Sequence, residues 1–246
     1  MDKIKIISGV VVCSNPSPFE YSRSLGWEGC RKTRIIELRP HDPKPPCAIR
    51  INLVECDIDQ NPEYSAISYC WGGQQPTTPI ICNDKLLLIT ETLALALSTF
   101  SKDIVEPLRL WADAICINQS DNEEKNVQVG MMRDIFCKAK KVDVWLGVDS
   151  PEKHVKTTFR ILDGLSNTIP RSGPTWKPGQ PLPWQLLHFQ SLIRLFELPW
   201  FSRVWVIQEI CLCQHAVVHC GDLHIEWEKL YGASLEFLGS PSGVLN

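Results

Sequence analysis

A carboxylate within an apolar stretch is the first feature of this sequence that could do chemistry. Asp113 stands in the middle of Leu108–Ile117, a nearly continuous apolar run. Burying a carboxylate costs free energy unless hydrogen bonds or a positive charge compensate for the lost water. Asp113 therefore either caps a nearby loop or orients the groups of a binding site, and the sequence leaves both interpretations open.

A second candidate combines an aromatic ring with a carboxylate. Trp205 and Glu209 lie four residues apart in a segment of helical character, so both side chains are expected on one helix face. Arg203 precedes them and offers a guanidinium that can contact phosphate. Taken alone, such a tryptophan is more often part of a core, and a helical glutamate usually faces solvent or forms an ion pair.

A third group, rich in thiols and imidazoles, lies near the C-terminal end. Its members are Cys211, Cys213, His215, His219, Cys220 and His224. The group lacks a C-x-x-C pair and fits no standard zinc finger. Two cysteines spaced two apart near a helix end do not face one another. We therefore predict no metal site and no bound cofactor.

Composition and charge narrow the class of protein. The chain has 246 residues, of which 44% are hydrophobic and 22% charged, as in a folded domain with a sizeable core. A formal net charge of −3 offers no basic field for a phosphate backbone, so no nucleic-acid partner is predicted. Eleven scattered cysteines suit reduced thiols and a cytoplasmic location. No segment approaches the roughly 20 apolar residues of a membrane span.

The elements that must position these side chains follow from hydrophobic periodicity and turn residues. Strands are predicted at residues 34–38, 48–53, 64–69, 80–82, 86–89, 108–117 and 142–146. Helices are predicted after Thr90 as N-cap, from a capping box at residues 120–123 to about residue 138, and at 152–166. This alternation predicts an α/β fold with a mainly parallel sheet and right-handed crossovers.

Functional groups in such sheets lie beyond the carboxyl ends of the strands. Three segments are expected at that edge, namely residues 71–73, residues 116–119 and the loop after Gly147.

The C-terminal third is predicted to be less regular. Five prolines between residues 169 and 184 predict a long loop or insertion. Helices are predicted at 185–198, 201–213 and 227–237, with hairpin strands at 216–219 and 223–225. By domain, residues 1–30 are an irregular extension, 31–230 form the globular domain, and 231–246 are a tail.

Three blocks of the sequence resemble the fungal heterokaryon-incompatibility (HET) family. The first, YSAISYCWG at residues 64–72, is similar to the family's Y-x-A-L-S-Y-x-W-G. The second, LWADAICINQ at 110–119 with WLG at 145–147, is similar to L-W-I-D-A-I-C-I-N-Q and its closing W-L-G. The third, RVWVIQE at 203–209, is similar to R-x-W-x-x-Q-E. This resemblance, over roughly residues 33–230, implies an intracellular domain that acts in self/non-self recognition and triggers cell death.

HET domains in turn resemble Toll/interleukin-receptor (TIR) domains, which implies a TIR-like, flavodoxin-like sheet. Many TIR domains carry a tryptophan followed four residues later by a catalytic glutamate, and they cleave the nicotinamide–ribose bond of NAD. On this resemblance Glu209 is the predicted catalytic carboxylate and Trp205 an aromatic wall, with NAD as the substrate. The cysteine that lies beside the TIR tryptophan is replaced here by Val206.

The resemblance also suggests residues that would hold the substrate. The predicted substrate-binding residues are Trp71, Gly72, Gly73, Asp113, Asn118, Arg203 and Trp205. The two glycines would let the backbone approach a ligand closely, although they also suit a simple tight turn. Asn118 equally suits closure of the turn before the next helix.

Two functions from different classes follow. As an NAD glycohydrolase, the domain would hydrolyse NAD when oligomerised, and loss of NAD would kill the cell. As an interaction module, it would assemble with itself or with an incompatibility partner and recruit downstream effectors. The lack of a recognisable nucleophile–base pair favours the second function.

Overall fold

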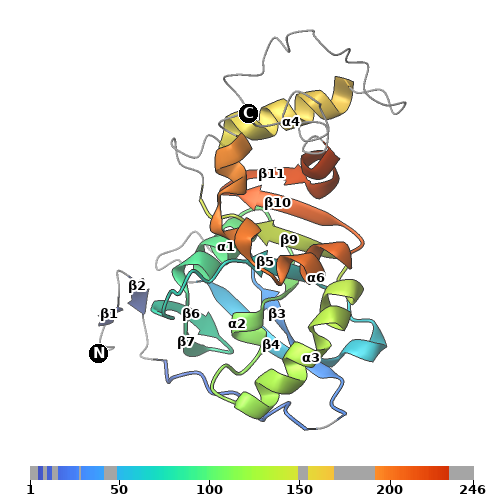
Figure 1. Ribbon diagram of the computed structural model, residues 1–246. Helices are drawn as coiled ribbons and strands as arrows, with labels where there is room; N and C mark the ends of the chain where they lie inside the picture. Colours follow the sequence, from blue (N-terminus) through green and yellow to red (C-terminus); the bar gives the residue numbers. More distant parts are fainter. Residues whose placement is uncertain are drawn as a thin grey trace.

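A nine-stranded sheet forms the centre of the molecule (Figure 1). The computed structural model describes residues 5–7, 10–12, 16–27, 29–41, 49–148, 155–168 and 192–232. The strands of the sheet are β3 (Lys32–Leu38), β4 (Arg50–Asp57), β5 (Ser65–Tyr69), β6 (Thr78–Cys82), β7 (Lys85–Ile89), β8 (Leu108–Trp111), β9 (Lys141–Trp145), β10 (Ala216–Cys220) and β11 (Leu223–Glu226). Their order across the sheet is β11-β10-β9-β5-β8-β3-β4-β6-β7.

The fold is α/β with a mixed sheet, which corrects the prediction of a mainly parallel one. Within the described chain, β10, β9, β5 and β8 form a parallel block, and β4 pairs with β6 in parallel. The pairs β3–β4, β3–β8, β6–β7 and β10–β11 are antiparallel. Short connections account for two of these pairs, because a tight turn can join only antiparallel neighbours.

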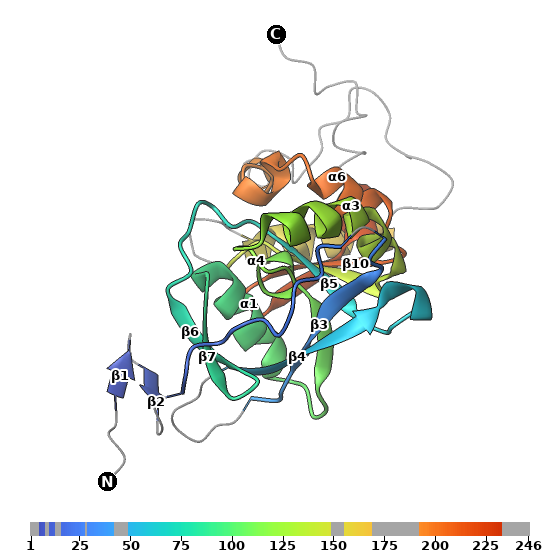
Figure 2. The same cartoon turned by 90° about the horizontal axis from the view of Figure 1, so that it is seen from below.

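Helices connect and flank the strands. They are α1 (Glu91–Ser101), α2 (Asp113–Cys116), α3 (Asn122–Lys138), α4 (Val155–Thr168) and α6 (Val206–Cys211), with the 3-10 turns η1 (Ile58–Gln60) and η3 (Pro199–Ser202). Residues 192–196 and 227–232 are also helical. Helices α3 and α6 contact one another beside the sheet, as Figure 2 also shows. Among the described residues, no helix is long and apolar enough to cross a membrane.

Several predicted elements are confirmed with small changes of boundary. The first two predicted strands pair antiparallel as β3 and β4, and β6 and β7 form a hairpin. Its turn residues Asn83 and Asp84 have φ angles of 49° and 61°, which these residue types tolerate. The Thr90 side chain caps α1 by accepting from the Leu93 amide at 3.4 Å. The predicted β10–β11 hairpin is also present.

Other predictions of local structure are wrong. The strand expected through residue 117 ends at Trp111, because Asp113 begins the short helix α2. Helix α3 is capped by Asp121 rather than Ser120. The helix expected at 201–213 is divided into η3 and the shorter α6. The extension predicted as irregular contains the antiparallel strands β1 (Lys5–Ile7) and β2 (Val10–Val12). The predicted Pro-rich loop at 169–184 lies outside the described residues.

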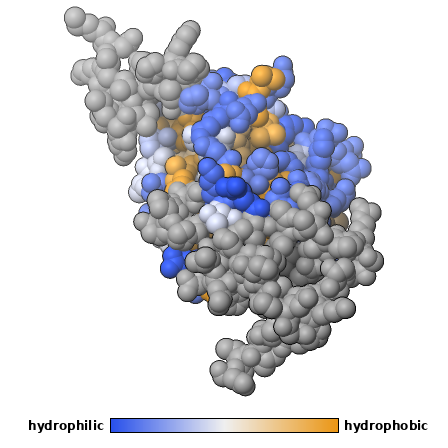
Figure 3. All heavy atoms as spheres, turned by 90° about the horizontal axis from the view of Figure 1, so that it is seen from above, coloured by the Kyte–Doolittle hydropathy of each residue, from blue (hydrophilic) through white to orange (hydrophobic). Residues whose placement is uncertain are grey.

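Three tryptophans mark the buried core. Trp111, Trp145 and Trp200 are at most 1% exposed. The indole of Trp111 donates to the hydroxyl of Thr33 at 3.0 Å, so its polar atom is satisfied. The ring of Trp145 lies edge-on to Phe100. Seen from above, the described surface is mainly hydrophilic, with separate apolar groups between the polar ones (Figure 3).

A buried ion pair fastens the N-terminal part of the domain to α3. The guanidinium of Arg34 and the carboxylate of Glu124 meet at 2.5 Å, with side chains 3% and 0% exposed. Glu124 also accepts from the backbone amides of Leu25 and Asn118. Burial alone would raise the pKa of Glu124, but the hydrogen bonds from Arg34 and these amides outweigh it and lower the pKa.

Candidate functional site

Polar side chains from three distant parts of the chain meet at the carboxyl end of β5. Ser68 and Tyr69 are the last residues of β5, and Trp71 follows them. Asp113 lies two residues after the end of β8, the parallel neighbour of β5, and Glu209 belongs to α6. Trp71, from the first segment expected at this edge, thus lies beside Asp113, which precedes the expected segment at residues 116–119.

Glu209 is buried and fully engaged. Its side chain is 2% exposed, and Arg203 donates to both of its oxygens, from Nη1 to Oε2 at 3.1 Å and from Nη2 to Oε1 at 3.0 Å. The hydroxyl of Ser68 donates to Oε2 as well. Trp200 in turn donates its indole hydrogen to the Ser68 oxygen at 2.7 Å. Because the carboxylate is paired and hydrogen-bonded, its burial is tolerated.

Asp113 occupies the neighbouring position and carries its own set of donors. The indole nitrogen of Trp71 donates to Oδ1 at 3.1 Å, and the Ala114 amide donates to the same atom at 2.8 Å. Burial raises the pKa of Asp113, and the charge of Glu209 adds to the increase. The hydrogen bonds and the charge of Arg203 act in the opposite direction and do not offset the burial. Asp113 is therefore both the first residue of α2 and a member of the polar cluster.

Tyr69 adds a hydroxyl without a good hydrogen bond. The residue is 2% exposed, and its hydroxyl oxygen has no hydrogen-bond partner of ordinary geometry within the described chain. Burial and its neighbour Asp113 raise the pKa of Tyr69 well above its usual value. The hydroxyl therefore faces Asp113, with which it interacts too weakly to count as an ordinary hydrogen bond.

The cluster combines two carboxyl groups with one guanidinium, that of Arg203. Arg203 pairs with Glu209, and the charges of both groups also act on the pKa of Asp113. The side chain of Arg203 is 20% exposed, whereas that of Glu209 is almost inaccessible. Arg203 is therefore the charged group of the cluster that an incoming anion can reach first.

The remaining predicted site residues lie outside this network. Gly72 and Gly73 have φ angles of 60° and 71° and form a turn closed by the Gln74 amide and the Trp71 carbonyl at 3.0 Å. Both glycines are exposed, so the turn borders the cluster without covering it. Asn118 accepts from the Ser120 amide at 3.1 Å, which is the turn-closing arrangement that the sequence also allowed.

Trp205 lies at a different depth from Glu209. The two residues are joined by the helical hydrogen bond from the Glu209 amide to the Trp205 carbonyl at 3.1 Å. The tryptophan is 47% exposed, however, while the glutamate is buried. The expectation that ring and carboxylate project together into one cleft is therefore wrong. Trp205 is the residue before α6 and adopts helical angles there, so its ring turns toward solvent.

Three members of the cluster carry no signal in the sequence that marks them as site residues. Ser68 and Tyr69 were identified only as part of a strand, although both fall in the block at residues 64–72. Trp200 lies between the helices predicted at 185–198 and 201–213, where the sequence predicts no contact with Ser68. Both faces of β5 are buried, so its sequence shows no regular alternation of polar and apolar residues. Nothing in that pattern therefore distinguished Ser68 from its neighbours.

The cysteine- and histidine-rich group near the C-terminal end of the chain does not form one cluster in the structure, because its histidines contact different partners. His219 lies 2.8 Å from the Asp143 carboxylate inside the parallel block. Burial would raise the pKa of Asp143, but His219 and Lys141 outweigh it and lower the pKa. His215 instead contacts Glu226 of β11 at 3.1 Å. Cys220 is buried, and Cys211 is exposed.

Comparison with known proteins identifies the family. The model of the heterokaryon incompatibility protein (HET) family matches residues 64–209, which contain the whole polar cluster. The chain is 32% identical over 222 residues to heterokaryon incompatibility protein 6, OR allele, of Neurospora crassa, an alignment that covers 74% of this chain. The chain spans 32% of the length of that relative. No solved structure matches the chain. The sequence blocks, their order and these matches show that the chain belongs to the HET family.

Proposed function

We propose that this chain triggers cell death in heterokaryon incompatibility by hydrolysing NAD at the cluster formed by Asp113, Arg203 and Glu209. The observation that carries the proposal is the meeting of these groups beside the carboxyl end of β5. Two carboxyl groups close to one guanidinium, with burial raising the pKa of one of them, are typical of functional sites rather than of stabilising surface pairs.

The strand order supports a nucleotide site at this place. Counted along the chain, the parallel strands β5, β8, β9 and β10 are first, second, third and fourth, and across the sheet they stand in the order second, first, third, fourth. This is the order of flavodoxin-like sheets, whose ligands bind where successive crossovers diverge, between the first and third strands. Here that position is the carboxyl end of β5 beside β9, next to Ser68 and Tyr69.

The ion pair between Arg203 and Glu209 suits a resting state. Each oxygen of Glu209 already accepts a hydrogen bond, so the carboxylate must be released before it can act on a sugar. The diphosphate of NAD would compete for the partly exposed guanidinium of Arg203. Exchanging one anion for another keeps the guanidinium paired and frees the carboxylate at the moment the substrate binds.

The reaction itself requires little from the protein. The bond between ribose C1′ and the nicotinamide nitrogen breaks, and its electron pair neutralises the pyridinium, so nicotinamide leaves uncharged. Water adds to C1′ and loses a proton, giving ADP-ribose. Glu209 would accept hydrogen bonds from the ribose hydroxyls and stabilise the developing positive charge.

Release of nicotinamide from NAD by the purified chain tests this proposal. The native protein should release nicotinamide in proportion to enzyme and time, and Glu209→Gln should lower the rate at least 100-fold. Glu63 is exposed and lies far from Glu209 in the sequence. The variant Glu63→Gln therefore serves as the matched control and should retain the native rate. Full activity in a folded Glu209→Gln variant would remove the assignment.

One observation favours a second function, that of an assembly module. Val204, Trp205 and Ile207 are 80%, 47% and 65% exposed, and all three lie in or beside α6. Neighbouring exposed apolar side chains of this kind mark surfaces that bind other proteins. If Ile207→Glu abolishes both self-association and killing, while Glu209→Gln changes neither, the chain acts as a recruiting module and not as an enzyme.

A further inference from the structure

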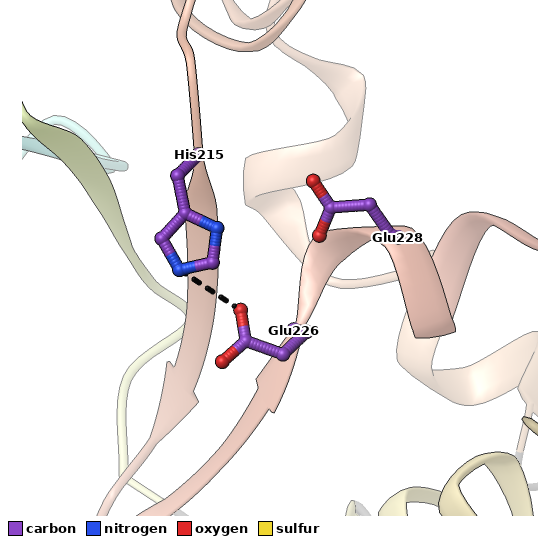
Figure 4. A group of neighbouring side chains, drawn as sticks. All are labelled: His215, Glu226 and Glu228. Atoms are coloured by element: carbon purple, nitrogen blue, oxygen red, sulfur yellow. Dashed lines mark ion pairs between the residues drawn. The ribbon is translucent and has the colours of Figure 1, made fainter.

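We propose that His215, Glu226 and Glu228 form a binding site for a zinc-class divalent metal ion. His215 directly precedes β10, Glu226 is the last residue of β11, and Glu228 lies in the first turn of the helix at 227–232. The antiparallel register pairs Val217 with Glu226 and so brings the start of β10 beside the end of β11. Figure 4 shows the imidazole and the two carboxylates gathered around one small region.

The distances within the group fit a shared ion. One potential ligand atom from each residue lies within 4.8 Å of the other two. His215 Nε2 and Glu226 Oε2 are 3.1 Å apart. Two ligands bound to the same zinc ion at about 2.1 Å stand about 3.0 to 3.5 Å apart, so this separation needs little adjustment.

An unsatisfied atom provides an independent reason for a ligand here. Glu226 Oε2 is inaccessible to solvent and has no hydrogen-bond partner within the described chain, despite its contact with His215. The two atoms are close, yet the ring nitrogen does not donate to the oxygen in an acceptable direction. The Glu226 side chain is 40% exposed as a whole, so only part of it is shielded, and Oε2 is the oxygen that faces His215. A cation between the imidazole and the carboxylates would satisfy Oε2 and the lone pair of a neutral imidazole together.

The ligand types indicate which ion the group would take. Imidazole nitrogen suits zinc and neighbouring transition metals, whereas calcium and magnesium prefer sets composed of oxygen atoms alone. Two carboxylates and a neutral imidazole carry a charge of about −2, which a divalent cation balances. Three protein ligands also leave a coordination position for water, as in zinc sites that are open to solvent.

The nearby thiols do not belong to this group. Cys213 stands two residues before His215, but its thiol donates to the Ile210 carbonyl at 3.1 Å. His224, on the same hairpin, is exposed and is not a member of the group. The site thus depends on the hairpin register rather than on closely spaced cysteines, which explains why the sequence predicted no metal.

Titration of the metal-freed chain with Zn²⁺ by calorimetry tests the site. We expect one equivalent whose affinity falls at least 10-fold in His215→Ala and in the double variant Glu226→Gln with Glu228→Gln. The matched control His224→Ala should bind as the native chain does.

X-ray absorption at the zinc edge distinguishes this site from the cysteines. The proposal predicts nitrogen and oxygen neighbours for the first equivalent, and no sulfur. Sulfur neighbours, the absence of saturable binding, or native affinity in both sets of variants would overturn it. Because His215→Ala could affect folding, the exposed residue Glu228 provides a second test, since Glu228→Gln alone should reduce the zinc-induced rise in melting temperature.

Discussion

At the scale of a single residue, Asp113 shows how a buried carboxyl group in the polar cluster affects the stability of the fold. Burial raises the pKa of its carboxyl group, so the folded protein holds a proton there more tightly than the unfolded chain does. The stability that this proton contributes is present below the unfolded pKa of about 3.9 and is lost as the pH rises through the higher folded value. At neutral pH the charged form therefore opposes folding.

Asp113→Asn should relieve this cost. Asparagine keeps an oxygen that can accept from Trp71 and from the Ala114 amide, and it carries no charge. We expect the free energy of unfolding at pH 7 to rise by about 0.5 to 2 kcal/mol, while NAD hydrolysis falls. Urea unfolding at several pH values measures the first effect, with the exposed Asp103→Asn as control. A variant that is less stable than the native chain at pH 7 would show that the charge itself holds the fold.

The sequence identified some members of the cluster and misjudged others for physical reasons. Asp113 stood out because a carboxylate in an apolar run must be compensated. The spacing of Trp205 and Glu209 placed both on one helical turn, but spacing alone does not determine which side chain faces the core. That depends on Ser68 and Trp200, which lie far away in sequence and are joined to Glu209 only by the fold.

At the scale of elements, α3 depends on its buried ion pair with β3. Glu124 has a lowered pKa, so its contribution to stability is present above the unfolded value of about 4.3 and is lost as the pH falls through the lower folded value. Glu124→Gln should reduce the free energy of unfolding by about 3 to 5 kcal/mol, because Arg34 is left buried without its charge partner.

Denaturant unfolding between pH 7 and pH 3.5 measures this loss. The native chain should lose stability below about pH 4.3, and Glu124→Gln should lose less over the same interval. Its neighbour Glu123 is exposed, so Glu123→Gln provides a matched control on the same helical turn. Equal stability of the two variants would contradict a structural role for the ion pair.

A close backbone contact fastens the N-terminal segment to the start of α3. A Cβ atom at Gly26 would lie 2.6 Å from the Glu124 backbone nitrogen and 2.9 Å from the Glu123 carbonyl carbon. Gly26→Ala should therefore destabilise the protein by about 1 to 3 kcal/mol, as overpacking does. Gly130→Ala, where nothing lies within 4 Å, should instead stabilise α3 by about 0.5 to 1 kcal/mol. Thermal unfolding of both variants measures the opposite signs, and a neutral Gly26→Ala would refute the contact.

The elements themselves were predictable where local signals were strong. As predicted, the Thr90 side chain caps α1, and Asn83 and Asp84 form the turn of the β6–β7 hairpin. Prediction failed where tertiary contacts decide the backbone. The apolar run after Leu108 suits a long strand, but α2 replaces its second half, and Trp71, which follows β5, supplies a donor to Asp113 there.

At the scale of the whole molecule, a parallel block carries the cluster and antiparallel strands extend the sheet on both sides. The parallel pairing of β9, β5 and β8 was predictable from the alternation of strands and helices, whereas β10 was predicted only as half of a hairpin. The strands that flank this block are β11 on one side and β3, β4, β6 and β7 on the other. Which edge of the sheet each of them joins is decided by tertiary contacts and not by local sequence signals. The result brings the blocks at residues 64–72, 110–119 and 203–209 to one edge of the sheet.

The family assignment gives this arrangement its biological setting. The HET match spans all three blocks, and the Neurospora crassa relative is named for heterokaryon incompatibility. Under the proposed function, the ion pair between Arg203 and Glu209 holds the carboxylate until the diphosphate of the substrate displaces it.

The most direct measurement follows cellular NAD and viability together after expression of the chain in a fungal host. NAD content should fall before viability does in cells that express the native chain, and both should remain unchanged in cells that express folded Glu209→Gln at equal amounts. Death at constant NAD content, or death caused equally by Glu209→Gln, would contradict the enzymatic account.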